Sequence, residues 1–195
     1  LSLGFGMVVV LLEDVKHEVD AANTELAIAH DNLRRASFYD SVTGSLNRQA
    51  YGEGLGLEAA RAAFGSVVML DMDNLKNIND QYGHGAGDRM LRYLVEVLRS
   101  ELRISDKLYR WGGDEFLLVF PGGDSQQIGR RMRAVLTACP PLSFAGAEIP
   151  LSVSVGSAGY ASAEHLPAAI DAADRAMYAD KAARKGDVAD VAHSA

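Results

Sequence analysis

The sequence predicts an α+β fold, in which a mixed sheet is packed against helices and is preceded by an N-terminal coiled-coil helix. Three observations support this. Apolar residues recur in alternating steps of three and four over residues 5–36, residues 66–73 and 149–161 resemble strands, and residues 107–121 read as strand, Gly-Gly turn, strand. Segments with helical periodicity lie between these strands. Packing such helices on a sheet buries the apolar faces of both.

The composition is that of a globular protein. Of its 195 residues 48% are hydrophobic and 23% are charged, and the net charge is -7. This charge argues against a nucleic-acid partner but not against a nucleotide substrate, since a bound metal ion can reverse the local field. The single cysteine, Cys139, cannot form an internal disulfide, which fits a reducing compartment.

The N-terminal segment predicts a helix that pairs with a second copy of itself. A period of 3.5 residues over roughly four heptads favours self-pairing over packing on the helix's own domain. The seam positions are Phe5, Val8, Leu12, Val15, Val19, Ala22, Leu26, Ala29, Leu33 and Ala36. Residues 1–12 are apolar but too few to span a bilayer, so the end of a membrane helix and the start of a soluble helix both remain open.

The middle of the chain supplies the first part of the sheet. In residues 40–48, DSVTGSLNR, Thr-Gly breaks the N-terminal helix, and a second helix follows that ends near Gly65. Residues 66–73 form a short apolar run that ends in acids, which indicates a buried strand. Residues 74–88 are polar and turn-rich, and residues 89–102 show the broad apolar face of a helix.

The second half supplies the remaining elements. Residues 107–121 predict a hairpin, and residues 125–139 predict a helix that Pro140 and Pro141 stop. Residues 149–161 alternate as a strand, and residues 166–185 predict a last helix. We expect three regions: a coiled-coil helix over 1–36, a globular domain over 37–186 and a frayed tail over 187–195.

Acidic residues gather at two places in this plan. Asp71 and Asp73 lie two apart at the end of a strand, and Asp114 and Glu115 follow the glycines of the hairpin. If the hairpin lies beside that strand, the carboxylates converge and need a shared cation, for which Mg²⁺ is the natural choice when phosphates supply the other oxygens. Two such ions would suit phosphoryl or nucleotidyl transfer.

Four motifs, in order and spacing, resemble the GGDEF-domain family, the diguanylate cyclases. They are DSVTGSLNR at 40–48, DMDNLKNINDQYGHGAGD at 71–88, RISD at 103–106 and RWGGDEF at 110–116. The resemblance covers residues 40–185. It implies a ferredoxin-like fold, as in nucleotidyl cyclase and polymerase palms, with a mixed five-stranded sheet surrounded by helices. It also implies condensation of two GTP into cyclic di-GMP and two pyrophosphates at a homodimer interface.

The resemblance also implies a role for each matching residue. Asp71, Asp114 and the carbonyl of Met72 would bind two Mg²⁺ ions, or Mn²⁺, and Glu115 would assist deprotonation of the 3′-hydroxyl. Asp73 and His84 receive no catalytic role. The implied substrate contacts are Asn74, Leu75, Lys76 and Lys181 for phosphate, Asn79 and Asp88 for guanine, and Arg110, Gly112 and Gly113 beside the signature turn.

The RISD motif resembles the family's inhibitory site, and five residues separate Asp106 from Gly112. The resemblance implies that Arg103 and Asp106 bind the product, cyclic di-GMP. The chain departs from the family at Val42, Ser45 and Leu75. After Lys181 the family's glycine-arginine pair is replaced, so that either Arg184 or Lys185 would contact phosphate.

The implied partners are GTP, cyclic di-GMP, a second copy of the chain through the N-terminal helix, and an upstream sensor or membrane domain. We expect a cytoplasmic catalytic domain, with tethering to the inner face of the cell membrane left open. One alternative is a catalytically weak module that senses GTP or cyclic di-GMP. A second is a cyclase that makes cyclic GMP-AMP, against which Asp88 argues. A third, a dimerisation helix with an inert passenger, leaves four motifs unexplained.

Overall fold

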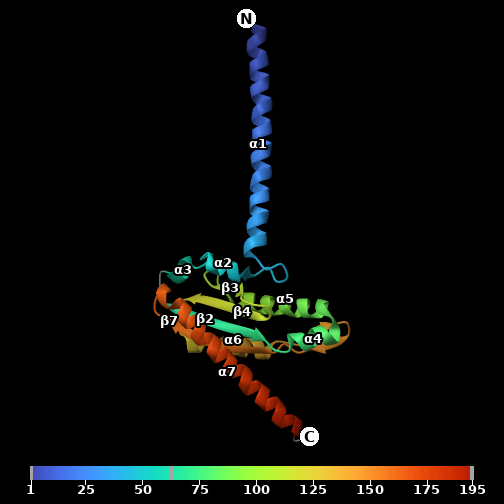
Figure 1. The fold of residues 1–195 in the computed structure, drawn as a ribbon, viewed down its shortest axis with the longest axis vertical. Coiled ribbons are helices and arrows are strands. Elements are labelled where there is room, and N and C mark those ends of the chain that lie inside the picture. Colours follow the sequence, from blue (N-terminus) through green and yellow to red (C-terminus); the bar gives the residue numbers. More distant parts are fainter. Residues whose placement is uncertain (1, 62–63, 194–195) are drawn as a thin grey trace. The chain divides into compact units, whose positions relative to one another are not determined.

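The computed structural model describes residues 2–61 and 64–193, and the chain divides into two units after Phe38. The first unit is the helix α1 (Ser2–Phe38), labelled in Figure 1, which confirms the predicted N-terminal helix. Three predicted seam residues in it, Val19, Leu26 and Leu33, are 50%, 68% and 71% exposed. Within the described residues no helix is long and apolar enough to span a membrane.

The second unit is built on a mixed five-stranded sheet (Figure 1), as the sequence predicted. Its two short strands are parallel to each other and all its other pairs are antiparallel. In spatial order the strands are β1 (Leu46–Asn47), β3 (Lys107–Arg110), β4 (Glu115–Pro121), β2 (Gly65–Met72) and β7 (Val153–Tyr160).

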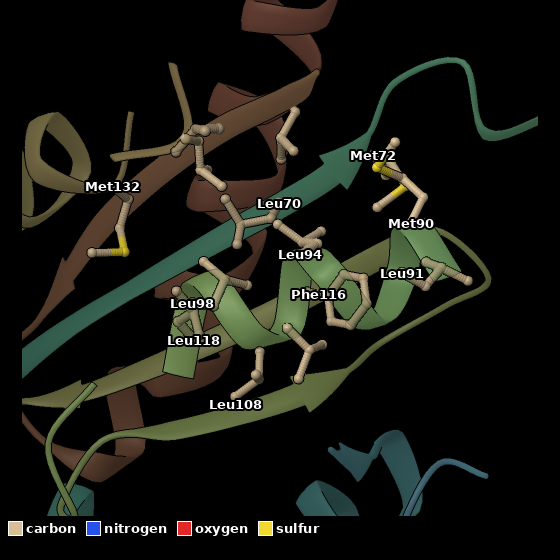
Figure 2. Packing of buried hydrophobic residues seen from close by; sticks show 14 of the residues in the cluster. Leu70, Met72, Met90, Leu91, Leu94, Leu98, Leu108, Phe116, Leu118 and Met132 are labelled. Carbon is tan, nitrogen blue, oxygen red and sulfur yellow. The ribbon is translucent and has the colours of Figure 1, made fainter. Parts of the chain in front are cut away.

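One face of the sheet packs against α5 (His84–Glu101) and α6 (Ser125–Ala138). Figure 2 shows this core, in which strand and helix side chains interlock: Leu70, Met72, Leu108, Phe116 and Leu118 meet Met90, Leu91, Leu94, Leu98 and Met132. Because side chains alternate along a strand and Leu70 and Met72 face this core, Asp71 faces the other side of the sheet.

The other face packs against α7 (Leu166–His193), which a 3₁₀ turn (Ala163–His165) introduces. The helix crosses β7 at Gly156, where a Cβ atom would lie 2.0 Å from the carbonyl oxygen of Ala173. A side chain there would force the helix away, so the glycine allows the close approach. This approach brings the C-terminal half of α7 to the strand end that carries Asp71.

The segment 74–88 was expected to be turn-rich, but it is largely helical. It forms α4 (Leu75–Tyr82) and the start of α5, separated at Gly83, whose φ is +84°. Its glycines suggested turns, but a Cβ on Gly87 would lie 2.0 Å from Oδ1 of Asn79. Glycine at 87 therefore serves close packing between the two helices.

The predicted helix before Gly65 is also corrected. Two short helices, α2 (Arg48–Gly52) and α3 (Glu58–Arg61), stand there because Gly54 and Gly56 adopt φ of +72° and +80°. The strand β1 and the small hairpin β5 (Leu142–Phe144) and β6 (Ala147–Ile149) were not predicted. The helix α7 continues to His193, past its predicted end, and residues 194–195 of the predicted tail lie outside the described residues.

Candidate active site

The sheet register places the signature hairpin beside Asp71. Glu115, the first residue of β4, pairs with Asp71 of β2. The backbone N–H of Met72 donates to the carbonyl of Asp114 at 2.9 Å, and that of Trp111 donates to the carbonyl of Glu115 at 2.8 Å. The predicted neighbourhood of strand and hairpin is therefore present, and it brings three carboxylates together.

These carboxylates interact electrostatically. Asp71 is only 4% exposed. Burial raises its pKa above the usual value, and the charges of Asp114 and Asp73 add to the increase, although a hydrogen bond from Lys181 opposes it. Burial also raises the pKa of Glu115, with contributions from Asp71 and Asp114. Such a cluster favours the binding of a cation.

The cation nearest to Asp71 in the structure is the ammonium group of Lys181. Its Nζ lies 2.7 Å from Oδ1 of Asp71. Burial alone would lower the pKa of Lys181, but the hydrogen bond and the negative charge of Asp71 outweigh it and raise the pKa. Lys181 is therefore charged, and α7 carries it to the site.

A cleft of about 380 Å³ opens beside the cluster. Its lining contains six residues for which the resemblance implied metal or phosphate contacts: Met72, Asn74, Leu75, Lys76, Asp114 and Lys181. Asn74 precedes α4 in the left-handed region, with φ of +60°, and its side chain does not cap the helix. The first N–H groups of a helix have no partner within the helix, so this end of α4 offers donors to an anion.

The two residues predicted to read guanine lie at the contact between α4 and α5. The side-chain oxygen of Asn79 sits against Gly87, next to Asp88 in the chain. The Asp88 carboxylate lies 3.9 Å from the guanidinium of Arg92, and both side chains are about half exposed. Neither Asn79 nor Asp88 belongs to the lining of the cleft.

The two signature glycines differ in their surroundings. A Cβ on Gly112 would lie 2.7 Å from Oε2 of Glu115, whereas a Cβ on Gly113 would meet no atom within 4 Å. Glycine at 112 thus makes room for the Glu115 carboxylate, whereas Gly113 leaves open space beside the turn.

Arg110 binds the backbone of the signature turn. Its guanidinium donates to the carbonyl of Gly113 at 2.6 and 3.2 Å and to the carboxylate of Asp40 at 2.9 Å. It is absent from the cleft lining, so its contacts are with the protein. Asp73, to which we gave no catalytic role, accepts hydrogen bonds of 2.8 Å from both Ser152 and Ser154.

The RISD residues line a separate pocket. The backbone N–H of Arg103 donates to Oδ2 of Asp106 at 2.9 Å, and both residues line a pocket of about 130 Å³. Arg131 of α6 lines the same pocket. The sequence did not single out Arg131, since it lies in no motif and only the fold brings α6 to this turn.

The structure also bears on the open choice after Lys181. Arg184 lines the cleft and donates to Asp180 at 3.3 Å. The side chain of Lys185 lies outside the described part of the chain. Arg184 is therefore the candidate whose place in the cleft can be stated.

The donor set is compatible with magnesium. Asp71, Asp114 and Glu115 influence one another electrostatically. Among the described residues, however, no three His, Cys, Asp or Glu side chains are arranged to bind one metal ion together. Mg²⁺ is often bound by one or two carboxylates, with phosphates and water completing its shell. Asp71, Asp114 and the carbonyl of Met72 fit that pattern in the presence of a nucleotide.

Comparisons with known proteins show which family the chain resembles. The family model described as diguanylate cyclase, GGDEF domain, matches residues 37–187. The diguanylate cyclase DgcP of Pseudomonas aeruginosa is 32% identical over 182 residues, which are 88% of this chain and 27% of that protein. The cyclic di-GMP phosphodiesterase NbdA of the same organism is 36% identical over 147 residues, 73% of this chain and 19% of that protein.

A solved structure adds the fold. The coiled coil and GGDEF domain of DgcB from Caulobacter crescentus, in complex with c-di-GMP, is 25% identical with a TM-score of 0.77, and the match covers 88% of this chain and 95% of that one. The site geometry, the family model and the matched fold lead to the same conclusion. This chain belongs to the GGDEF-domain family.

Proposed function

We propose that the chain is a diguanylate cyclase that condenses two GTP into cyclic di-GMP and releases two pyrophosphates. The observation that carries this proposal is the meeting of Asp71, Asp114 and Glu115 where β2 pairs with β4. The cleft beside them carries Lys76 and Lys181 and the N-terminal end of α4, which suit a triphosphate.

Each group would have a separate task. The N–H groups of Asn74 and Leu75, with Lys76 and Lys181, would hold phosphates. Asp71, Asp114 and the Met72 carbonyl would hold two Mg²⁺ ions, with Mn²⁺ as the substitute, and the bound metal supplies charge stabilisation for the reacting phosphoryl oxygens. Glu115 would assist deprotonation of the 3′-hydroxyl, since it lies opposite Asp71 in the β2–β4 pair, beside the proposed metal ligands.

Base choice would depend on Asn79 and Asp88. Guanine presents N1–H and N2–H as adjacent donors, and a carboxylate can accept from both. Adenine lacks this pair, so an Asp88 that faces the base would disfavour ATP. This argument supports cyclic di-GMP over cyclic GMP-AMP.

The reaction requires two nucleotides, so two protomers would each present one GTP. The exposure of Val19, Leu26 and Leu33 along α1 supports a paired helix that holds the protomers together. The helix over 1–36 would then pass a signal from an upstream sensor to a catalytic domain over 37–186. GTP as substrate places that domain in the cytoplasm, whether or not a longer protein tethers it to the membrane.

Product inhibition would act through the separate pocket. Arg103 and Asp106 line it together with Arg131, so two guanidinium groups and a carboxylate are available to phosphate and guanine. The pocket and the cleft have no lining residue in common, so the product could bind while the cleft is filled.

A sensor of GTP or cyclic di-GMP with weak catalysis is the second candidate. It is favoured by the match to NbdA, since that relative is named as a phosphodiesterase and not as a cyclase. The two candidates differ in turnover, which a direct assay measures.

The test is to incubate the purified chain with GTP and Mg²⁺, and separately with ATP, and to separate the products by chromatography. We expect cyclic di-GMP from GTP alone, and its loss in Asp114→Ala. Asp171→Ala, which removes an exposed acid on α7, is the matched control and should leave the product unchanged. GTP that is bound but never converted would contradict the cyclase and support the sensor.

A further inference from the structure

The contact between Lys181 and Asp71 occupies one of the groups that we assign to the metal. Nζ of Lys181 lies 2.7 Å from Oδ1 of Asp71, and the two side chains are 25% and 5% exposed. The other two charges that act on Asp71, those of Asp114 and Asp73, are negative. The ammonium is thus the cation that offsets this carboxylate group in the structure.

An ammonium and a divalent ion do not share such a carboxylate easily. Mg²⁺ binds oxygen at about 2.0–2.1 Å and demands a nearly ideal octahedral shell. Since Asp71 is nearly buried, a metal ion on its carboxylate would lie within a few ångströms of Nζ. Like charges at that separation repel strongly where water is scarce.

If a metal ion displaced Lys181 from Asp71, its ammonium group would have other possible partners nearby. Lys181 lines the cleft together with Lys76 and Arg184, on the side where the N-terminal end of α4 also opens. A phosphate in that cleft would offer the anionic oxygens that Asp71 no longer provides. Rotation of the flexible lysine side chain would direct its ammonium group into this cleft.

We propose that Lys181 competes with the divalent cation for Asp71: the ammonium neutralises Asp71 when the metal is absent and moves to the nucleotide phosphates when the metal binds. The first half of this inference concerns the empty enzyme alone. The second half rests on the proposed function, because it names a nucleotide as the new partner. Lys181 thereby couples metal binding to nucleotide binding.

The inference makes two opposite predictions for one variant. Lys181→Met keeps the aliphatic part of the side chain and removes the competitor, so Mn²⁺ should bind more tightly. The same variant loses a phosphate contact, so GTP should bind more weakly. A residue that merely supported the fold would weaken both.

The experiment measures Mn²⁺ binding without nucleotide by electron paramagnetic resonance. We expect Lys181→Met to bind Mn²⁺ about tenfold more tightly than wild type, the factor that corresponds to one charged hydrogen bond. Arg184→Met is the matched control, since Arg184 lines the same cleft but bonds to Asp180 and not to Asp71. Its Mn²⁺ affinity should change by less than about fivefold, the upper range for solvent-exposed charges.

A second arm measures GTP binding in EDTA by calorimetry, where Lys181→Met should bind several-fold more weakly than wild type. A thermal scan gives an independent check of folding, and Mn²⁺ should raise the melting temperature of Lys181→Met more than that of wild type. Equal or weaker Mn²⁺ binding by Lys181→Met, no measurable binding by either protein, or an equal gain in Arg184→Met would overturn the inference. Failure of the proposed function would appear instead as no turnover of GTP by wild type, which the nucleotide-free titration does not involve.

Discussion

Arg110 joins Asp40 to the signature turn: its guanidinium donates to the Asp40 carboxylate at 2.9 Å, while its other nitrogens donate to the carbonyl of Gly113. Asp40 follows the last residue of α1 by two positions. It also accepts hydrogen bonds from the N–H and hydroxyl of Thr43, at 2.8 and 2.7 Å. The entry to the catalytic unit and the turn before Asp114 are therefore linked through one carboxylate.

Asp40→Asn should destabilise the catalytic unit by about 1.5–3 kcal/mol at neutral pH, the range for a hydrogen bond to a charged group. Burial opposes ionisation of Asp40, but the hydrogen bonds from Thr43 and Arg110 outweigh it and lower its pKa below 3.8. Because the pKa of Asp40 is lower in the folded protein than in the unfolded chain, its ionised form stabilises the fold. This stabilisation is complete above the unfolded-state pKa and is lost as the pH falls through the folded-state pKa. Urea unfolding at neutral pH and near pH 3 measures both effects.

The difference between wild type and Asp40→Asn should therefore shrink in acid. Asp171→Asn, an exposed acid of the same unit, is the control and should change stability by less than about 0.5 kcal/mol. A difference for Asp40→Asn that is the same at both pH values would contradict the role of the charge.

Arg103→Ala and Arg131→Ala should each relieve product inhibition. Both side chains line the pocket that contains Asp106, and loss of one charged contact corresponds to an inhibition constant about tenfold higher. Arg130→Ala is the matched control, because Arg130 is the exposed neighbour on α6 and does not line the pocket. Initial rates at increasing cyclic di-GMP give the constants, and equal inhibition of wild type and Arg103→Ala would exclude this pocket as the inhibitory site.

If the proposed dimer forms through α1, Leu26→Asp should dissociate it, whereas Ile28→Asp should not. Both residues are exposed on α1, at 68% and 57%, but only Leu26 lies on the predicted seam. Two buried leucines lost per dimer correspond to roughly 3 kcal/mol, or about a hundredfold in the dissociation constant. Sedimentation equilibrium and turnover at dilute protein are the measurements, and equal behaviour of the two variants would argue against a paired seam.

Gly87→Ala should weaken GTP binding because its Cβ would displace the side-chain oxygen of Asn79, from which it would lie 2.0 Å away. We expect the KM for GTP to rise about tenfold or more, as for other small displacements of binding groups. Gly85→Ala is the control on the same helix, since its Cβ would meet no atom within 4 Å. A KM that rises equally in both variants would point to the helix and not to Asn79.

The pattern of apolar residues predicted the helices and strands in which it is strong. The structure shows why other elements were missed. The apolar run before Asp71 and the hairpin around Gly112 and Gly113 stand as predicted, because their patterns are local. The helix α4 was missed because its glycine-rich continuation suggested turns, although Gly87 meets a packing demand that only the tertiary structure shows.

Part of the candidate site was likewise predictable from local motifs, and part depends on the fold. The matching motifs supplied Asp71 and Asp114, but their proximity depends on the pairing of Asp71 with Glu115 across two strands, which spacing along the chain does not determine. Arg131 and the contact between Lys181 and Asp71 join residues that are far apart in sequence. No local pattern encodes them.

The contacts of Val155 have a consequence for how copies of this protein meet. Val155 lies on β7, the last strand of the sheet, whose outer edge would otherwise present free backbone groups. Its N–H donates to Asp180 at 2.9 Å, and its carbonyl accepts from Arg133, which also pairs with Asp180. The N–H and C=O of Val155 are therefore not free to pair with a strand of another molecule. This protects the sheet edge at Val155 against edge-to-edge aggregation.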